Sequence, residues 1–344
     1  MALESEDFNL TELKQLTDVD WKNNHHCRAV AAGLVQGVYK SERKRQESQG
    51  PKVQSSHWQH SHFRQKIVLT DNKDSSIYGV VYEFKHTNSI PLPECAPKFV
   101  IAFRGTFLKS GSAEQDVNLI IKLLTAELPK DNSRCKPALD AVKEVVKEDE
   151  TAIIWLAGHS LGSAIAMLVG KSMAQKGKYL ETFLFNPPFL RSFLSRNINS
   201  PRLENVICST KKVIRSGISF VGGDHLWEKR HGQFNALSHW IPNLFVNKDD
   251  PLCSGYIDHF KNRKIEAEIR SIRSAFTAAF GKDRELPIHL LPQAYLTISE
   301  NSSSCNFFEA HGIKQWWYQM SIGEGFADSS TKVSIGDTNL VGEP

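Results

Sequence analysis

The run Gly158-His159-Ser160-Leu161-Gly162 is the part of the chain whose residue types and spacing most clearly suggest chemistry. An apolar segment typical of a buried strand, 151–157, precedes it, and a helical segment of small and apolar residues, 161–176, follows it. A strand, a sharp turn and a helix around G-x-S-x-G form a nucleophile elbow, which presents a serine hydroxyl for attack on a carbonyl group. We expect any side chain at 158 or 162 to collide with a neighbouring strand or helix. The alternative is a chance pattern in which Ser160 only caps a helix.

A nucleophilic serine needs a base, and the base needs a carboxylate that orients it. After an elbow the chain order is serine, acid, histidine, so the search is restricted to the C-terminal half. The predicted strand 244–246 is followed by Asp249 and Asp250, and sites in parallel sheets form where strands end. Both carboxylates are candidates, and we prefer Asp250. The alternative is a solvated Asp-Pro turn.

Three histidines follow the candidate acids. His259 lies on a predicted helix close to them, and His289 sits among leucines, isoleucine and prolines, as a core histidine does. His311 precedes a glycine near the end of the predicted domain. We therefore predict His311 as the base, the alternative being a core or surface histidine.

Two backbone N–H groups are expected to form the oxyanion hole. One belongs to Leu161, the residue after the nucleophile, and the other should come from the loop after an early strand. The segment 98–103 is such a strand, and Thr106 in the loop after it is the candidate donor. From the residues alone, this loop could be any strand-to-helix turn.

The elements that must position these residues alternate between strands and helices. Such alternation predicts an α/β fold with a mostly parallel central sheet and helices on both faces. We divide the chain into a helical and basic N-terminal extension (1–64), one α/β domain (65–326) with a candidate cap at 191–240, and a flexible tail (327–344). The remaining predicted strands are 66–70, 77–84 and 182–185, and the remaining predicted helices are 21–47, 116–128, 137–147 and 266–280.

Composition excludes several classes of protein. With 344 residues, 40% of them hydrophobic and 23% charged, the chain is neither largely disordered, nor collagen-like, nor a disulfide scaffold. Its net charge of +4 is too small to indicate a dedicated nucleic-acid binder. The segment 40–66 holds seven basic and two acidic residues, so it is a candidate for peripheral contact with an anionic membrane. A solvated helix end is the alternative.

The N-terminus is polar and acidic and has no signal-peptide pattern, and no segment has the pattern of a transmembrane helix. The six cysteines are scattered, as reduced thiols are, and we predict a cytoplasmic location. His57, His60 and His62 have no cysteine or carboxylate at metal-site spacing. We therefore predict no metal and no cofactor, and nothing in the sequence indicates the oligomeric state.

Several motifs together resemble the class 3 lipases, a family of α/β-hydrolases, over about residues 21–318. The resemblance rests on the elbow, on the segments 102–106 and 184–188, on an Asp-Pro after a later strand, and on a late His-Gly. The chain is most similar to a plant subgroup often named GDSL esterase/lipase, although it contains no Gly-Asp-Ser-Leu run. The resemblance implies that Ser160, Asp250 and His311 are nucleophile, acid and base, and that Thr106 and Leu161 form the oxyanion hole.

The expected function is hydrolysis of acyl or lipid esters through an acyl-enzyme intermediate, with no cofactor. The alternative is a lipase-like binding or signalling protein with little or no hydrolase activity. The segment after 186–188 does not match the typical lipase continuation, so the sequence leaves open whether a lid covers Ser160.

Overall fold

A computed structural model describes residues 19–47, 62–86, 91–105, 134–189, 237–261, 291–299, 307–318 and 331–334. Eight strands in these ranges form one sheet in which spatial order equals chain order. The five central strands β3 to β7 are parallel, and antiparallel strands flank them on both sides. The strands are β1 (Phe63–Thr70), β2 (Ile77–Phe84), β3 (Phe99–Phe103), β4 (Ile154–His159), β5 (Glu181–Phe185), β6 (Asn243–Asn247), β7 (Gln293–Ser299) and β8 (Thr331–Ser334).

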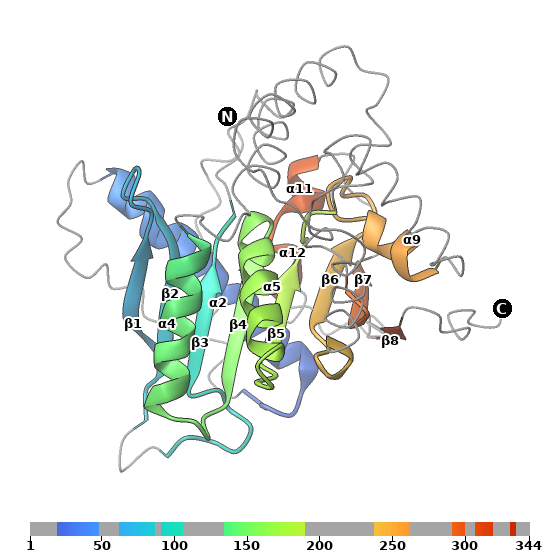
Figure 1. Cartoon of the computed structure of the whole chain (residues 1–344). Helices are drawn as coiled ribbons and strands as arrows, with labels where there is room; N and C mark the ends of the chain where they lie inside the picture. Colours follow the sequence, from blue (N-terminus) through green and yellow to red (C-terminus); the bar gives the residue numbers. More distant parts are fainter. Residues whose placement is uncertain are drawn as a thin grey trace, which may run out of the picture.

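Helices cover both faces of this sheet. In Figure 1, α4 (Cys135–Glu148) and α5 (Leu161–Ala174) lie on the near face and α2 (Asn24–Glu47) on the far face. Side chains along a strand alternate between the two faces, and two separate buried clusters result. Val81, Ile101 and Leu156 pack with α4 and α5, and their neighbours Val80, Val100 and Trp155 pack with α2. The shorter helices are η2 (Leu237–His239), α9 (Gly255–Lys261), α11 (Phe307–His311) and α12 (Gln315–Tyr318).

The prediction of a mostly parallel sheet with helices on both faces is confirmed. The strand 77–84 has the predicted bounds, whereas β7 and β8 were not predicted. The tail expected to be flexible includes β8, which pairs antiparallel with β7 and so extends the sheet. The predicted helices 116–128 and 266–280, and residues 191–236 of the candidate cap, lie outside the described residues.

The helix α2 packs against the sheet. Its buried residues share one cluster with side chains of β2, β3, β4 and β5. In the structure β1 begins at Phe63, and the division of the chain at residue 65 stays a prediction of the sequence.

A buried carboxylate links α2 to the sheet. Glu42 is fully buried, and it accepts bonds from Arg45 at 2.7 Å and from the backbone N–H of Ile77 in β2 at 2.7 Å. Burial alone would raise the pKa of Glu42, but the bonds from Arg45, Ile77 and Gln46 outweigh burial and lower it. Arg104, directly after β3, lies 4.0 Å from the same carboxylate. The Glu42 charge therefore joins three elements of the fold.

Removal of this carboxylate should destabilise the protein. We expect Glu42→Ala to lower the free energy of unfolding by roughly 3 kcal/mol, because a buried ion pair loses one partner. The control is Glu94→Ala, which removes a carboxylate whose side chain is 82% exposed in its pair with Lys22; exposed pairs contribute less than about 1 kcal/mol. The measurement is urea denaturation, and equal losses in the two variants would contradict the prediction.

Candidate active site

Ser160 occupies a sharp turn between β4 and α5. β4 ends at His159 and α5 begins at Leu161, so the turn consists of Ser160 alone. The backbone of Ser160 has φ 53° and ψ −123°, a region that non-glycine residues rarely adopt. Such a conformation costs roughly 1–3 kcal/mol and persists only where the surroundings impose it. The N–H of Ser160 donates to the carbonyl of Phe185 in β5 at 3.0 Å, which helps to hold the turn.

The two glycines of the elbow are required by close packing. A Cβ atom at Gly158 would lie less than 3 Å from the backbone of Gly162 in the first turn of α5. A Cβ atom at Gly162 would be equally close to the backbone of Phe103 in β3. The expected collisions at 158 and 162 are confirmed. Because glycine has no side chain, the first turn of α5 can pack closely against β3 and β4.

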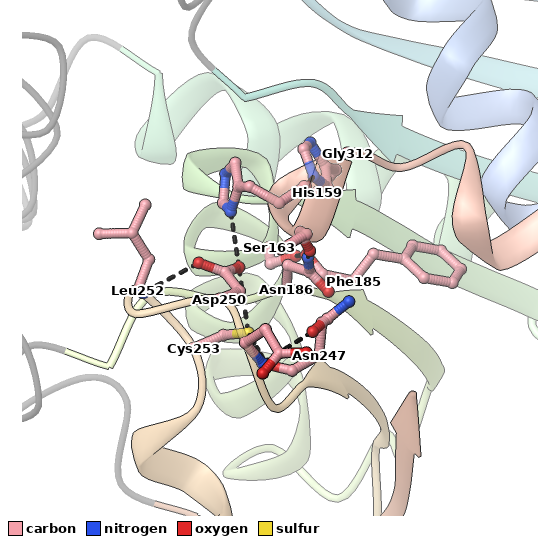
Figure 2. Close-up of polar contacts among 12 residues, drawn as sticks. His159, Ser163, Phe185, Asn186, Asn247, Asp250, Leu252, Cys253 and Gly312 are labelled. Atoms are coloured by element: carbon pink, nitrogen blue, oxygen red, sulfur yellow. Dashed lines mark hydrogen bonds and ion pairs between the residues drawn. The ribbon is translucent and has the colours of Figure 1, made fainter. Parts of the chain in front are cut away.

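Asp250 and His311 meet at the edge of the sheet where the parallel strands end. Asp250 follows β6 and is 0% exposed, and the Nδ1 of His311 lies 2.7 Å from its Oδ2. The N–H of Leu252 donates to Oδ1 at 2.9 Å, and the thiol of Cys253 lies 3.1 Å from Oδ2 (Figure 2). Asp249, the alternative carboxylate, is exposed. Of the two aspartates left open by the sequence, Asp250 is therefore the one that contacts His311.

The bond to Asp250 determines which nitrogen of neutral His311 carries the proton. An ionised carboxylate can only accept a hydrogen bond, so Nδ1 is the donor and Nε2 retains its lone pair. Nε2 is buried and has no hydrogen-bond partner among the described residues. Burial, and then the charge of Asp250, raises the pKa of Cys253, so this residue stays a thiol and donates. His311 thus presents a basic nitrogen that no described group occupies.

The turn that carries His311 is fixed through its backbone. The three consecutive carbonyls 310–312 all accept hydrogen bonds from side chains. Asn186 donates to the first at 2.9 Å, Gln315 donates to the first and third at 2.8 Å, and the Nε2 of His159 lies 2.7 Å from the second. The backbone around His311 is therefore held by side chains from several elements at once.

The other residues predicted for the site lie in different places, and two of them lie outside the described residues. Leu161 is the first residue of α5, where backbone N–H groups have no partner within the helix. Thr106 and His289 lie outside the described residues. His259 is buried in α9, with its Nε2 3.3 Å from the carbonyl of Leu291. The structure brings Asp250 and His311 into contact.

Sequence reasoning did not single out Asn186, Cys253 or Gln315. Asn186 has a positive φ of 42°, and its Oδ1 accepts from the indole N–H of Trp316 at 3.0 Å. Asn247 donates to the Oε1 of Gln315 at 2.8 Å. One signal was available for Asn186, since an asparagine after a buried strand can take a left-handed conformation. The contacts of Gln315 and Cys253 have no local signature in the sequence.

Other predicted features lie apart from this site. Within the described ranges, no three His, Cys, Asp or Glu side chains gather closely enough to hold a metal ion. No helix among the described residues is both long and apolar enough to cross a membrane. In the basic segment 40–66, Arg45 pairs with Glu42, and Arg64 and Lys66 pair with Glu83. Contact of this segment with a membrane stays a prediction.

The sheet and the turn around Ser160 define a class of protein. A mostly parallel sheet, covered on both faces and carrying a strand–serine–helix turn, is the arrangement of the α/β-hydrolases. The family model described as Lipase (class 3) matches residues 100–192, a range that includes most of β3 and all of β4, β5 and Ser160.

A relative matches almost the whole chain. The Arabidopsis thaliana protein named "GDSL esterase/lipase At4g10955" is 37% identical over 341 residues, which cover 92% of this chain and 96% of the relative. The chain belongs to the class 3 lipase family. The Gly-Asp-Ser-Leu run in the relative's name is absent from this chain, whose serine lies in Gly158-His159-Ser160-Leu161-Gly162.

The buried neutral state of His159 predicts a pH dependence of stability. Burial, and then repulsion from His311 when both rings are protonated, lowers the pKa of His159 to about 3, whereas an unfolded histidine titrates near about 6.5. Below about pH 6.5 the unfolded state binds a proton that the folded state does not, so the free energy of unfolding decreases. Between pH 7 and pH 5, the His159 imidazole should lower the free energy of unfolding by about 2 kcal/mol.

Urea denaturation at these two pH values tests the expectation. His159→Gln should reduce the pH dependence by about 2 kcal/mol relative to wild type, since glutamine does not titrate. His239→Gln, at an exposed histidine, serves as the control and should keep the wild-type dependence. The same dependence in wild type and His159→Gln would contradict the prediction.

Proposed function

We propose that this chain hydrolyses carboxylic esters of acyl or lipid type, with Ser160 as nucleophile, His311 as base and Asp250 as the residue that orients the base. The observation that carries the proposal is the 2.7 Å contact between buried Asp250 and the Nδ1 of His311. The strained backbone of Ser160 supports it, because strain of this kind is found at nucleophile elbows. Membership of the class 3 lipase family supports an ester as the substrate.

The first half of the proposed reaction forms an acyl-enzyme. Ser160 Oγ attacks the ester carbonyl carbon while the Nε2 of His311 takes the hydroxyl proton. The negative charge on the carbonyl oxygen is stabilised by the N–H of Leu161 and by that of Thr106, which stays a sequence prediction. The carbon–oxygen bond to the alcohol then breaks, and His311 returns its proton to the leaving alcohol.

The second half releases the acid. Water attacks the acyl carbon, and His311 Nε2 takes a proton from this water. The tetrahedral intermediate collapses with cleavage of the bond to Ser160 Oγ, which regains the proton from His311. Throughout, the Asp250 carboxylate stabilises the imidazolium that forms twice per turnover. No metal or cofactor enters the proposed steps.

Covalent labelling tests the nucleophile. A fluorophosphonate probe should modify the folded wild-type protein on the peptide that contains Ser160, because the probe requires an activated serine. We expect Ser160→Ala to remove the label and the hydrolysis of p-nitrophenyl esters. Ser172→Ala, which changes a partly exposed serine on the same helix, should leave both unchanged. Mass spectrometry of the labelled peptide identifies the site.

Two outcomes would contradict the proposal. Label that persists in Ser160→Ala would assign the chemistry to another serine. A folded wild type that neither reacts with the probe nor cleaves any ester, from short p-nitrophenyl esters to phospholipids and triacylglycerol, would favour a binding or signalling role.

A further inference from the structure

A continuous chain of hydrogen bonds runs from the N-terminal helix to the turn that carries His311. The N–H of Gly105 lies 2.7 Å from the hydroxyl oxygen of Tyr39, which is part of α2. The same hydroxyl lies 2.8 Å from the Nδ1 of His159, and the Nε2 of His159 lies 2.7 Å from the carbonyl oxygen of His311. Three contacts thus join residues far apart in the sequence.

The chemistry of the partners fixes the direction of every bond. A backbone N–H only donates, so the Tyr39 oxygen accepts from Gly105. A carbonyl only accepts, so the Nε2 of His159 must carry a proton. A neutral imidazole then has an unprotonated Nδ1, which accepts from the Tyr39 hydroxyl. The low pKa of His159, about 3, keeps the ring neutral at neutral pH. The His311 carbonyl therefore selects this tautomer, and the Tyr39 hydroxyl donates to the nitrogen that it leaves unprotonated.

These hydrogen bonds reach residues next to three parts of the proposed mechanism. His159 immediately precedes Ser160. Gly105 lies against the nucleophile, since a Cβ atom built on it would be 2.8 Å from the Cβ of Ser160. It also immediately precedes Thr106, the predicted oxyanion donor, and its carbonyl accepts from Arg104 at 2.7 Å.

We propose that Tyr39 and His159 are positioning residues, which together hold Gly105 and the backbone of His311 at fixed places relative to Ser160. The inference rests on the proposed function, since it assigns the pair a task in that reaction. Neither residue needs to touch the substrate. Their task is to keep the proposed nucleophile, the proposed base and Gly105 in one arrangement, and small displacements of reacting groups reduce turnover strongly.

The first test removes the Tyr39 hydroxyl and compares the hydrolysis of p-nitrophenyl butyrate by the full-length variant with that by full-length wild type. Tyr39→Phe should lower kcat about 10- to 100-fold and change KM less than about threefold. The control is Tyr82→Phe, which removes a hydroxyl from a tyrosine of the same α2-facing cluster; its kcat and KM should stay within about twofold of wild type. Thermal unfolding identifies any variant that fails to fold.

The second test asks whether the two residues act as one unit. Glutamine at 159 can still donate to the His311 carbonyl but offers no imidazole nitrogen to Tyr39. His159→Gln should therefore lower kcat, and adding Tyr39→Phe should change it by less than about threefold. If the fold-decrease in kcat of the double variant equals the product of the two single-variant decreases, the residues act independently. That result would overturn the inference.

The outcomes separate this inference from the proposed function. If Ser160→Ala is inactive but Tyr39→Phe keeps a kcat within about twofold of wild type, the positioning role is rejected. The serine mechanism then stays intact. A Tyr39→Phe variant altered only in KM would make Tyr39 a substrate contact and also reject the inference. Full activity of Ser160→Ala would instead reject the proposed function. Loss of kcat in Tyr39→Phe, with Tyr82→Phe unaffected and Ser160→Ala inactive, supports both.

Discussion

A carboxylate with no exposed surface is costly unless its charge is compensated, and Asp250 is such a group. Its compensation comes from the N–H of Leu252, the thiol of Cys253 and the ring of His311. The first two lie within a few residues, whereas His311 is 61 positions away. This one charge therefore links the end of β6 to the short helix α11, and the contact leaves the lone pair of His311 on Nε2, as the proposed mechanism requires.

The helix α2 contributes to the same arrangement from the other side of the sheet. Its apolar face packs on the strands, Glu42 bonds to β2, and Tyr39 contacts both Gly105 and His159. Residues that contact the neighbours of Ser160 therefore come from the N-terminal helix as well as from the strand ends. The same helix thus packs on the strands and contacts residues next to Ser160.

Local signals in the sequence were sufficient for the elbow and most strands. The turn at Ser160 could be predicted because its glycines and flanking apolar segments lie within a few residues of one another. The missed strand β7 mixes polar and apolar residues, so it has neither the continuous apolar run of 151–157 nor a clear alternation. The contact of Tyr39 with His159 could not be predicted, since it joins residues 120 positions apart. The sequence favoured Asp250 over Asp249 but left both open, because neighbouring residues share most local signals; burial and the contact with His311 distinguish them.

The comparison of Asp250→Asn with Asp249→Asn tests the central claim most directly, because one substitution removes the buried charge beside His311 and the other removes an exposed charge next to it in sequence. For ester hydrolysis by folded protein, Asp250→Asn should lower kcat by about 10³- to 10⁴-fold, whereas Asp249→Asn should stay within about threefold of wild type. Near wild-type activity in Asp250→Asn, or an equal or larger loss in Asp249→Asn, would contradict the account.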